Sequence, residues 1–367
     1  MFPPIEYVHW ILPRIEAAVH DLGSSDLRPE AGGDGEVVPP RLADLPTPGA
    51  SLRELVADAY GVDAERVLVT PGASSANLLA TAVALGASAD ASDESAASPG
   101  RVLVEKPGYE PHVATPRGLG ATVDRYRRGE AWELDPDRIE AAAMDETTLV
   151  VASNRHNPTG ARAGRETLAE AAEAAASADA RLLVDEVYAP YGAAGEGDGA
   201  FGGPTAAGVP NAVVTGSLTK FWGFGPLRVG WLVADPSFVE RAREVAFHFM
   251  AVAGPSRTLA RRALAARSDI VADQRERCLA NHDLLRSFVA DRSDLDGHVF
   301  EGCPYALLTH EEADGDAVAV AAWEDDVLVV PGRFFGVPEG VRVSLGEPPE
   351  RAEASLAAFG EALGRVV

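Results

Sequence analysis

The chain has 367 residues, 46% of them hydrophobic and 24% charged, which is enough apolar sequence for a large globular domain with a smaller one beside it. This composition excludes an intrinsically disordered acidic chain. Its 56 acidic residues outnumber the 32 basic ones, and the formal net charge of −24 repels phosphate backbones and anionic lipids, so neither nucleic acid nor a membrane is expected as a partner.

Short apolar runs alternate with alanine-rich helical stretches between about residues 50 and 235. This alternation is typical of a mostly parallel sheet covered by helices. Helices fit between the strands, for example at 74–85 and 165–177. The seven strands predicted in this part of the chain are 66–70, 102–105, 121–125, 149–153, 181–185, 212–215 and 229–233.

After residue 235 the pattern changes to a long helical region dotted with Arg and Glu, which extends to residue 292. Strands are predicted at 306–309, 327–330 and 341–344, and a last helix from Pro349. We therefore predict a large domain over 41–249 and a small α/β domain formed by 1–40 and 250–367. Segments 86–100 and 192–204, rich in small residues and glycine, are predicted to be exposed loops.

Only two cysteines occur, Cys278 and Cys303, too few for a disulfide framework and not spaced as a metal clip. The first residues have no basic segment followed by an apolar stretch and a cleavage site, and nowhere do eighteen apolar residues follow one another. We expect a cytoplasmic protein with no metal site.

All but two of the basic residues are arginine, the exceptions being Lys106 and Lys220. This preference for arginine and the excess of acidic residues resemble the composition of proteins from salt-loving archaea. Such proteins stay soluble because their acidic surfaces repel one another, and salt screens the repulsion between charges within each molecule. A genome rich in G and C also favours arginine and alanine codons. The expected source is a halophilic archaeon.

Lys220 lies in the stretch V-V-T-G-S-L-T-K-F-W-G-F-G-P-L-R-V-G, residues 213–230. Arginine would serve wherever only a cation is needed, whereas lysine can lose its proton and attack a carbonyl, and an apolar setting favours the neutral amine. The alternative is a surface lysine that lies across aromatic side chains. We interpret Lys220 as a reactive amine.

Three other motifs carry chemistry. In R-L-L-V-D-E-V-Y, residues 181–188, a strand ends in Asp185 and Glu186 and brings a carboxylate to the carboxyl edge of the sheet, where open α/β folds bind ligands. In S-N-R-H-N-P-T-G, residues 153–160, a strand enters an Asn-Pro turn. In T-P-G-A-S-S-A-N-L, residues 70–78, a glycine turn starts a helix whose free N–H groups are suited to bind an anion such as a phosphate.

In this order the four motifs resemble the class I/II aminotransferases, pyridoxal-phosphate (PLP) enzymes of fold type I. The resemblance covers residues 49–342 and includes V-E-K-P-G-Y-E-P-H at 104–112 and V-V-P-G-R-F-F-G…V-R-V-S at 329–344. It implies an α/β fold with a mostly parallel seven-stranded sheet, helices on both faces and a smaller α/β domain. It also implies transfer of an amino group from an L-amino acid to a 2-oxo acid.

The resemblance assigns the catalytic roles to Lys220, Asp185 and Tyr188. Lys220 would hold PLP as an internal aldimine, and later carry the proton between the substrate α-carbon and the cofactor. Asp185 would pair with the pyridinium nitrogen, so that the ring can accept electrons. His112 is similar to the residue that supports this carboxylate.

The remaining cofactor contacts come from the same resemblance. Asn157 and Tyr188 would donate to the phenolic oxygen of the ring, and Tyr109 would stack on its face. Arg342, with Asn157, would bind the substrate α-carboxylate. The phosphate would be held by Ala73, Ser74, Ser217 and Arg228, the last offering a planar fork to the dianion.

The sequence also departs from the family pattern. Asp44 and Leu45 stand where relatives often have a tyrosine that reaches the phosphate of the neighbouring subunit, and Arg155 replaces a proline of the Asn-Pro turn. Analogy with the family alone suggests a lid over the substrate that contains Tyr7, Trp10 and residues 24–27. Of these, Trp10 is better explained by packing in the core.

Two alternatives to transamination stay open. A lyase, decarboxylase or cyclising enzyme of the same fold would keep every PLP residue and break a different bond. A non-catalytic PLP-binding regulator is disfavoured by the negative charge and by the lack of room for a DNA-binding module. No second arginine is assigned to a distal carboxylate, so acidic, aromatic and small aliphatic amino acids all stay open as substrates. A homodimer is expected by resemblance.

Overall fold

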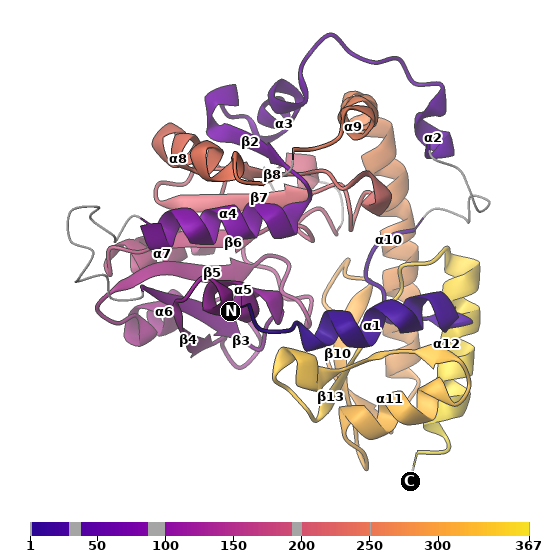
Figure 1. The fold of residues 1–367 in the computed structure, drawn as a ribbon. Helices are drawn as coiled ribbons and strands as arrows, with labels where there is room; N and C mark the ends of the chain where they lie inside the picture. Colours follow the sequence, from indigo (N-terminus) through magenta and orange to yellow (C-terminus); the bar gives the residue numbers. More distant parts are fainter. Residues whose placement is uncertain (1, 29–37, 87–99, 193–199, 250, 367) are drawn as a thin grey trace.

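The computed structural model describes residues 2–28, 38–86, 100–192, 200–249 and 251–366 (Figure 1). Most of the predicted loops 86–100 and 192–204 lies outside these ranges. A seven-stranded sheet has the order β2-β8-β7-β6-β5-β3-β4, and β8 runs in the opposite direction to the other six strands. Its strands are β2 Val67–Thr70, β3 Arg101–Lys106, β4 Thr122–Arg127, β5 Thr147–Ser153, β6 Arg181–Asp185, β7 Ala212–Ser217 and β8 Gly230–Val233.

The central strands are apolar on both faces because helices cover both. In β5, Leu149 and Val151 join one hydrophobic cluster and Val150 and Ala152 join another, since successive side chains point to opposite faces. The first cluster lies under α4 (Ala73–Gly86) and α8 (Pro236–Ala246). The second lies under α3 (Leu52–Tyr60), α7 (Arg165–Ala176) and α9 (Gly254–Ala265). The predicted mostly parallel sheet with helices on both faces is confirmed.

A second sheet, antiparallel, has the order β12-β13-β10-β9. Its core includes Leu285 of α10, Phe359 of α12 and Leu308 of β10. The division of the chain at 40/41 and 249/250 stays a prediction. The elements of this part are α10 Arg267–Ala290, β9 Leu295–Asp296, β10 Tyr305–His310, α11 Gly315–Trp323, β11 Val327–Leu328, β12 Val330–Pro331, β13 Gly340–Ser344 and α12 Pro349–Leu363.

The predicted strand 327–330 is divided between two sheets. β11 pairs in parallel with β1 (His20–Asp21), whereas β12 pairs antiparallel with β13. Helix α1 (Glu6–Ala17) packs beside them, on Val330, Phe334 and Phe335 (Figure 1). The first residues of the chain therefore lie against its C-terminal part. The other helices are α2 Pro40–Ala43, α5 Pro111–Gly118 and α6 Pro136–Ala142, with four 3-10 turns, η1 Ala64–Arg66, η2 Ala200–Gly202, η3 Gly225–Leu227 and η4 Gly332–Phe335.

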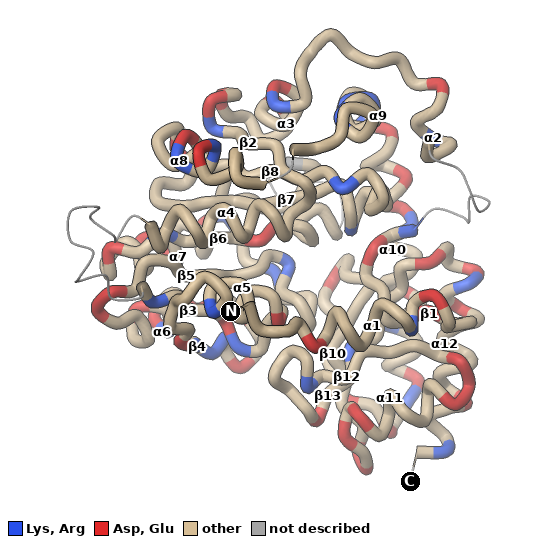
Figure 2. Tube along the Cα trace, viewed as in Figure 1, with Lys and Arg blue, Asp and Glu red and all other residues tan. Residues whose placement is uncertain are grey.

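Acidic residues are spread along the helices and loops around the sheets (Figure 2). Within the described ranges, no helix is both long enough and apolar enough to cross a lipid bilayer.

Candidate active site

A cavity of about 180 Å³ lies at the carboxyl ends of three adjacent parallel strands, where Ser153 ends β5, Asp185 ends β6 and Ser217 ends β7. This edge of a parallel sheet is where open α/β folds bind ligands. All nine residues predicted to contact the cofactor line the cavity. Its full lining is Tyr7, Ala73, Ser74, Asn77, Tyr109, His112, Ser153, Asn157, Asp185, Val187, Tyr188, Ser217, Thr219, Lys220 and Arg228.

One end of the cavity is built for an anion. Helix α4 starts at Ala73, after Gly72 with a φ of +84°. A Cβ atom on Gly72 would lie 3.2 Å from Nη2 of Arg228, so the guanidinium lies directly against this turn. A Cβ atom on Gly230 would lie 2.7 Å from the Ala73 nitrogen, so only glycine lets β8 approach the start of the helix. Ala73, Ser74, Ser217 and Arg228 all line the cavity, so backbone N–H groups, a guanidinium and a hydroxyl are available there to bind an anion.

Asp185 is held by three donors. Asn77 Nδ2 donates to Oδ2 at 2.8 Å, His112 Nε2 lies 3.2 Å from the same oxygen, and the Val187 N–H donates to Oδ1 at 3.2 Å. Burial raises the pKa of Asp185, but the hydrogen bond and charge of His112 and the amide of Asn77 outweigh it, and the net pKa is lowered. The carboxylate is therefore anionic at neutral pH.

Asn77 was missed by the sequence analysis. It lies one turn after Ser74 on α4, and its Oδ1 accepts from the Thr215 hydroxyl at 2.7 Å, which fixes the side of the amide that faces Asp185. Asn77 is a single amide side chain in the otherwise alanine- and leucine-rich helix α4, and this sequence feature could have marked it as a site residue.

Lys220 is half-buried and lines the cavity, and its carbonyl accepts from the Leu27 N–H at 2.8 Å. Burial is the largest effect and lowers the pKa of Lys220, but Tyr188, Asp26 and Tyr7 together raise it more, so that the net pKa is raised. The expectation that an apolar setting favours the neutral amine is wrong here, because the amine faces polar groups in the cavity while the neighbouring aromatic Phe221 is buried in the core.

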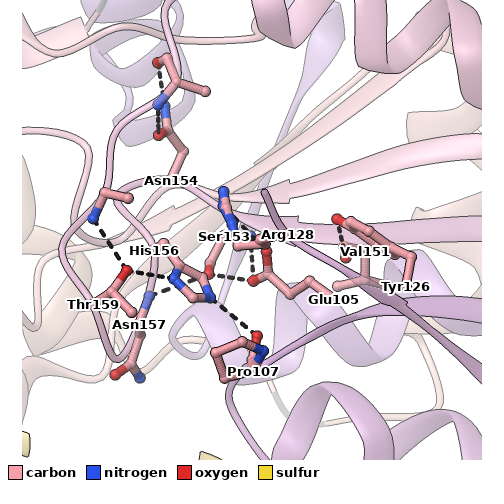
Figure 3. Close-up of polar contacts among 12 residues, drawn as sticks. Glu105, Pro107, Tyr126, Arg128, Val151, Ser153, Asn154, His156, Asn157 and Thr159 are labelled. Carbon is pink, nitrogen blue, oxygen red and sulfur yellow. Dashed lines mark hydrogen bonds and ion pairs between the residues drawn. The ribbon is translucent and has the colours of Figure 1, made fainter. Parts of the chain in front are cut away.

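The Asn-Pro turn is anchored to the sheet (Figure 3). The Ser153 N–H and hydroxyl donate to Glu105 at 2.9 and 2.5 Å, and the Asn157 N–H donates to Ser153 Oγ at 3.4 Å. The Asn154 side chain closes the turn by two hydrogen bonds to the backbone of Ala163, at 3.1 and 3.0 Å. These contacts hold Asn157 at the wall of the cavity.

Arg342 lies behind this wall. It is 1% exposed and does not line the cavity. Its Nη1 donates to Asn157 Oδ1 at 2.8 Å, and its Nη2 donates to the Gly23 carbonyl at 2.7 Å and to the Tyr7 hydroxyl at 3.3 Å. Since the guanidinium engages Asn157 Oδ1, the amide nitrogen of Asn157 is the group left to donate into the cavity. The predicted contact of Arg342 with a substrate carboxylate stays a prediction.

Both predicted tyrosines, Tyr109 and Tyr188, line the cavity. The Tyr188 hydroxyl is 2.6 Å from Ser25 Oγ, and the Tyr109 ring meets the His112 ring edge-on at 5.4 Å. Burial raises the pKa of Tyr109, so its phenol stays neutral. Ser25 belongs to residues 24–27, which were predicted to form part of a lid over the substrate only by analogy with the family.

Residues 41–359 match the family model for aminotransferase class I and II. The chain belongs to this family. It is 28% identical over 336 residues to the histidinol-phosphate aminotransferase of Erythrobacter litoralis (88% of this chain, 85% of the relative). It is 31% identical over 221 residues to the aromatic amino acid aminotransferase of Nocardia farcinica (59% of this chain, 58% of the relative). The histidinol-phosphate aminotransferase of Haloferax volcanii is 28% identical (89% of this chain, 84% of the relative).

Solved structures share the fold. A PLP-dependent aminotransferase from Streptococcus suis has a TM-score of 0.84 at 21% identity, covering 100% of this chain and 99% of that one. The PLP-dependent cyclase OrfR has a TM-score of 0.80 at 25% identity, covering 100% and 98%.

The protein is a PLP-dependent aminotransferase. The donor set of the cavity fits this cofactor, because an anion cradle at Gly72 and Arg228, an anionic Asp185 and the amine of Lys220 face one space. The relatives are mostly bacterial with one archaeal, so they do not support the predicted source in a halophilic archaeon.

Proposed function

We propose that this aminotransferase moves the amino group of an L-amino acid to a 2-oxo acid, with Lys220 as the residue that holds PLP and moves the proton at the substrate α-carbon. The observation that carries the proposal is that Lys220 faces the same cavity as anionic Asp185 and the anion cradle at Arg228. When bound, PLP supplies the electron sink that stabilises charge developing on the α-carbon.

The other residues have supporting roles. Asp185, kept anionic by Asn77 and His112, would hold a proton on the ring nitrogen. Asn157 and Tyr188 would donate to the ring oxygen. Tyr109 would cover the ring face, and the phosphate would be held by Ala73, Ser74, Ser217 and Arg228.

Product analysis tests this proposal. The cofactor-loaded protein is given 2-oxoglutarate and, one at a time, aromatic, acidic and aliphatic L-amino acids and histidinol phosphate. We expect glutamate and the oxo product of one donor class in equal amounts. Lys220→Ala abolishes both products, whereas Lys106→Ala, which changes the other, exposed lysine, retains them. Ammonia, carbon dioxide or pyruvate formed without an acceptor would contradict transamination and indicate a lyase or decarboxylase.

A cyclising enzyme is the second candidate, and the 25% identity to OrfR across the whole chain favours it over a lyase or a decarboxylase. Such an enzyme converts one amino acid to a cyclic product with no 2-oxo acid acceptor. Mass spectrometry of the same reactions separates the two, because only transamination consumes 2-oxoglutarate.

We further propose a cytoplasmic homodimer adapted to salt. Phe247 and Phe249 are 74% and 49% exposed in a groove that Pro71 and Ser75, next to the anion cradle, also line. A second copy of the chain that covers this groove would adjoin the cofactor site. Light scattering should give twice the mass of the chain, and Phe247→Glu should shift the mass toward the monomer; a wild-type monomer would contradict the dimer.

A further inference from the structure

The N-terminus of α1 is capped from a distant part of the chain. The backbone N–H groups of Glu6 and Tyr7 donate to the two carboxylate oxygens of Glu110, at 2.9 and 2.7 Å. The residue before the helix, Ile5, offers no capping side chain. First-turn N–H groups have no partner within a helix and carry the positive end of its dipole, so a carboxylate is the favoured partner. Glu110 thus ties α1 to the loop that leads into α5.

This tie joins two walls of the active-site cavity. Glu110 directly follows Tyr109 in the chain, and its carboxylate accepts a hydrogen bond from the Tyr7 N–H. Both tyrosines line the cavity. Their rings meet edge-on at 6.0 Å. The contact with Glu110 therefore fixes the distance between the first turn of α1 and the wall that Tyr109 forms.

Tyr7 also stands in front of Arg342. The guanidinium is buried and donates to the Tyr7 hydroxyl oxygen at 3.3 Å, while its other contacts go to Asn157 and Gly23. Because Tyr7 and Asn157 line the cavity and Arg342 does not, an anion in the cavity meets Tyr7 and Asn157 first. A phenol whose oxygen accepts from Arg342 still has its own O–H to donate.

We propose that Glu110 is a positioning residue for the α-carboxylate of the substrate. It holds α1 so that the Tyr7 hydroxyl, backed by Arg342, donates to that carboxylate. The proposal rests on the proposed function, since it assigns the carboxylate of an amino-acid substrate to this part of the cavity. A purely structural cap would stabilise α1 and leave substrate binding unchanged.

The test compares Glu110→Ala, Glu110→Gln and Tyr7→Phe in the cofactor-loaded protein. The matched control is Glu54→Ala, because Glu54 likewise accepts a backbone N–H, from Ser51 at 2.7 Å, at the start of α3. Glu110→Ala should raise the KM for the amino-acid donor about tenfold and leave kcat within about twofold, a change in binding. Glu110→Gln should have a smaller effect, since it keeps one acceptor. Glu54→Ala should leave KM unchanged.

Two readouts do not need turnover. Hydrogen exchange at the Glu6 and Tyr7 amides should accelerate in Glu110→Ala. Calorimetry measures the binding of three carboxylates that carry no amino group: 3-phenylpropionate, 4-methylpentanoate and glutarate. The acid that binds the wild type most tightly should bind Glu110→Ala about tenfold more weakly. The same loss is expected for Tyr7→Phe, and the double variant should lose no more than either single one.

Three results would overturn the proposal: faster exchange of α1 with unchanged affinity for the carboxylates, equal losses in Glu54→Ala, or no binding of any of the three acids to the wild type. If the wild type transaminates no donor, the proposed function fails, and calorimetry still decides whether Glu110 positions the carboxylate site.

Discussion

Asp185 and Glu186 are neighbours in the chain, both at most 5% exposed, yet their carboxyl groups have pKa values shifted in opposite directions. Asp185 faces the cavity, where Asn77 and His112 outweigh the effect of burial. Glu186 accepts from the Thr205 hydroxyl and the Ala206 N–H, both at 2.7 Å, and burial raises its pKa to about 8. One residue is therefore available as an anion for a cofactor, and the other is a neutral structural acid.

The raised pKa of Glu186 predicts a loss of stability with rising pH. Its folded-state pKa of about 8 exceeds the ordinary 4.5, so the folded protein binds more protons than the unfolded chain between these values. Stability contributed by this group is fully present below pH 4.5 and is lost as the pH rises through 8. Glu186→Gln should remove this loss.

Calorimetric Tm values between pH 5.5 and 9 check this prediction. The wild-type Tm should fall relative to that of Glu186→Gln as the pH rises. Parallel curves for the two proteins would show that Glu186 does not titrate in this window. Asp185 contributes in the opposite sense, because its lowered pKa adds stability that is lost only as the pH falls through the folded-state value.

Asn77 should set the acid limb of the pH profile. Asn77→Ala removes a donor from Asp185, so the pKa of Asp185 should rise and the acid limb of kcat/KM should move to higher pH. The lost hydrogen bonds should also cost about 1–3 kcal/mol of stability.

The matched control for this variant is Asn281→Ala. Asn281 is also buried and donates to two carbonyls, those of Leu345 and Glu347, at 2.8 and 2.9 Å. It should lose similar stability with no shift of the pH profile. An unmoved acid limb in Asn77→Ala would show that this amide does not tune Asp185.

Gly72 should matter for the cofactor as well as for the fold. Gly72→Ala places a side chain in the left-handed region at a φ of +84°, with its Cβ 3.2 Å from Arg228. Gly61→Ala, at a φ of +63° with nothing within 4 Å, has the same backbone cost of roughly 1–2 kcal/mol. Only Gly72→Ala should weaken cofactor binding, by about tenfold in a fluorescence titration. Equal affinities for the two variants would argue against the anion cradle.

The net charge of −24 predicts salt dependence. Repulsion among acidic surface groups is screened by salt, since the Debye length falls from about 10 Å at 0.1 M to about 3 Å at 1 M. The Tm should rise on going from 0.1 to 2 M KCl. A Tm that is independent of salt would contradict the proposed adaptation.

The main sheet was predictable because most of its strands are short apolar runs, and most of them alternate with helices. All seven predicted strands form, with bounds that differ by at most two residues at either end. The segment 327–330 was predicted as one strand, since hydrophobicity does not reveal that Leu328 and Val330 belong to different sheets.

The site was predictable where motifs carry it, and less so where distant segments meet. The nine residues that the motifs predict to contact the cofactor line one cavity, and their contacts with it stay predictions. Asn77 contacts Asp185, 108 residues away in the chain, and Tyr7 contacts Arg342, 335 residues away. No local sequence pattern predicts either contact. The pKa of Lys220 also depends on groups brought together only by folding.

The role of Lys220 is tested most directly by absorption spectra of the cofactor-loaded wild type, Lys220→Ala and Lys106→Ala, before and after a donor amino acid is added. We predict a visible band in the wild type and in Lys106→Ala that disappears with the donor and returns with a 2-oxo acid. Lys220→Ala should lack both the wild-type band and its reversal by the 2-oxo acid, because it has no side-chain amine to join the PLP carbonyl or to move the proton at the substrate α-carbon. An unchanged band and response in Lys220→Ala would contradict the account.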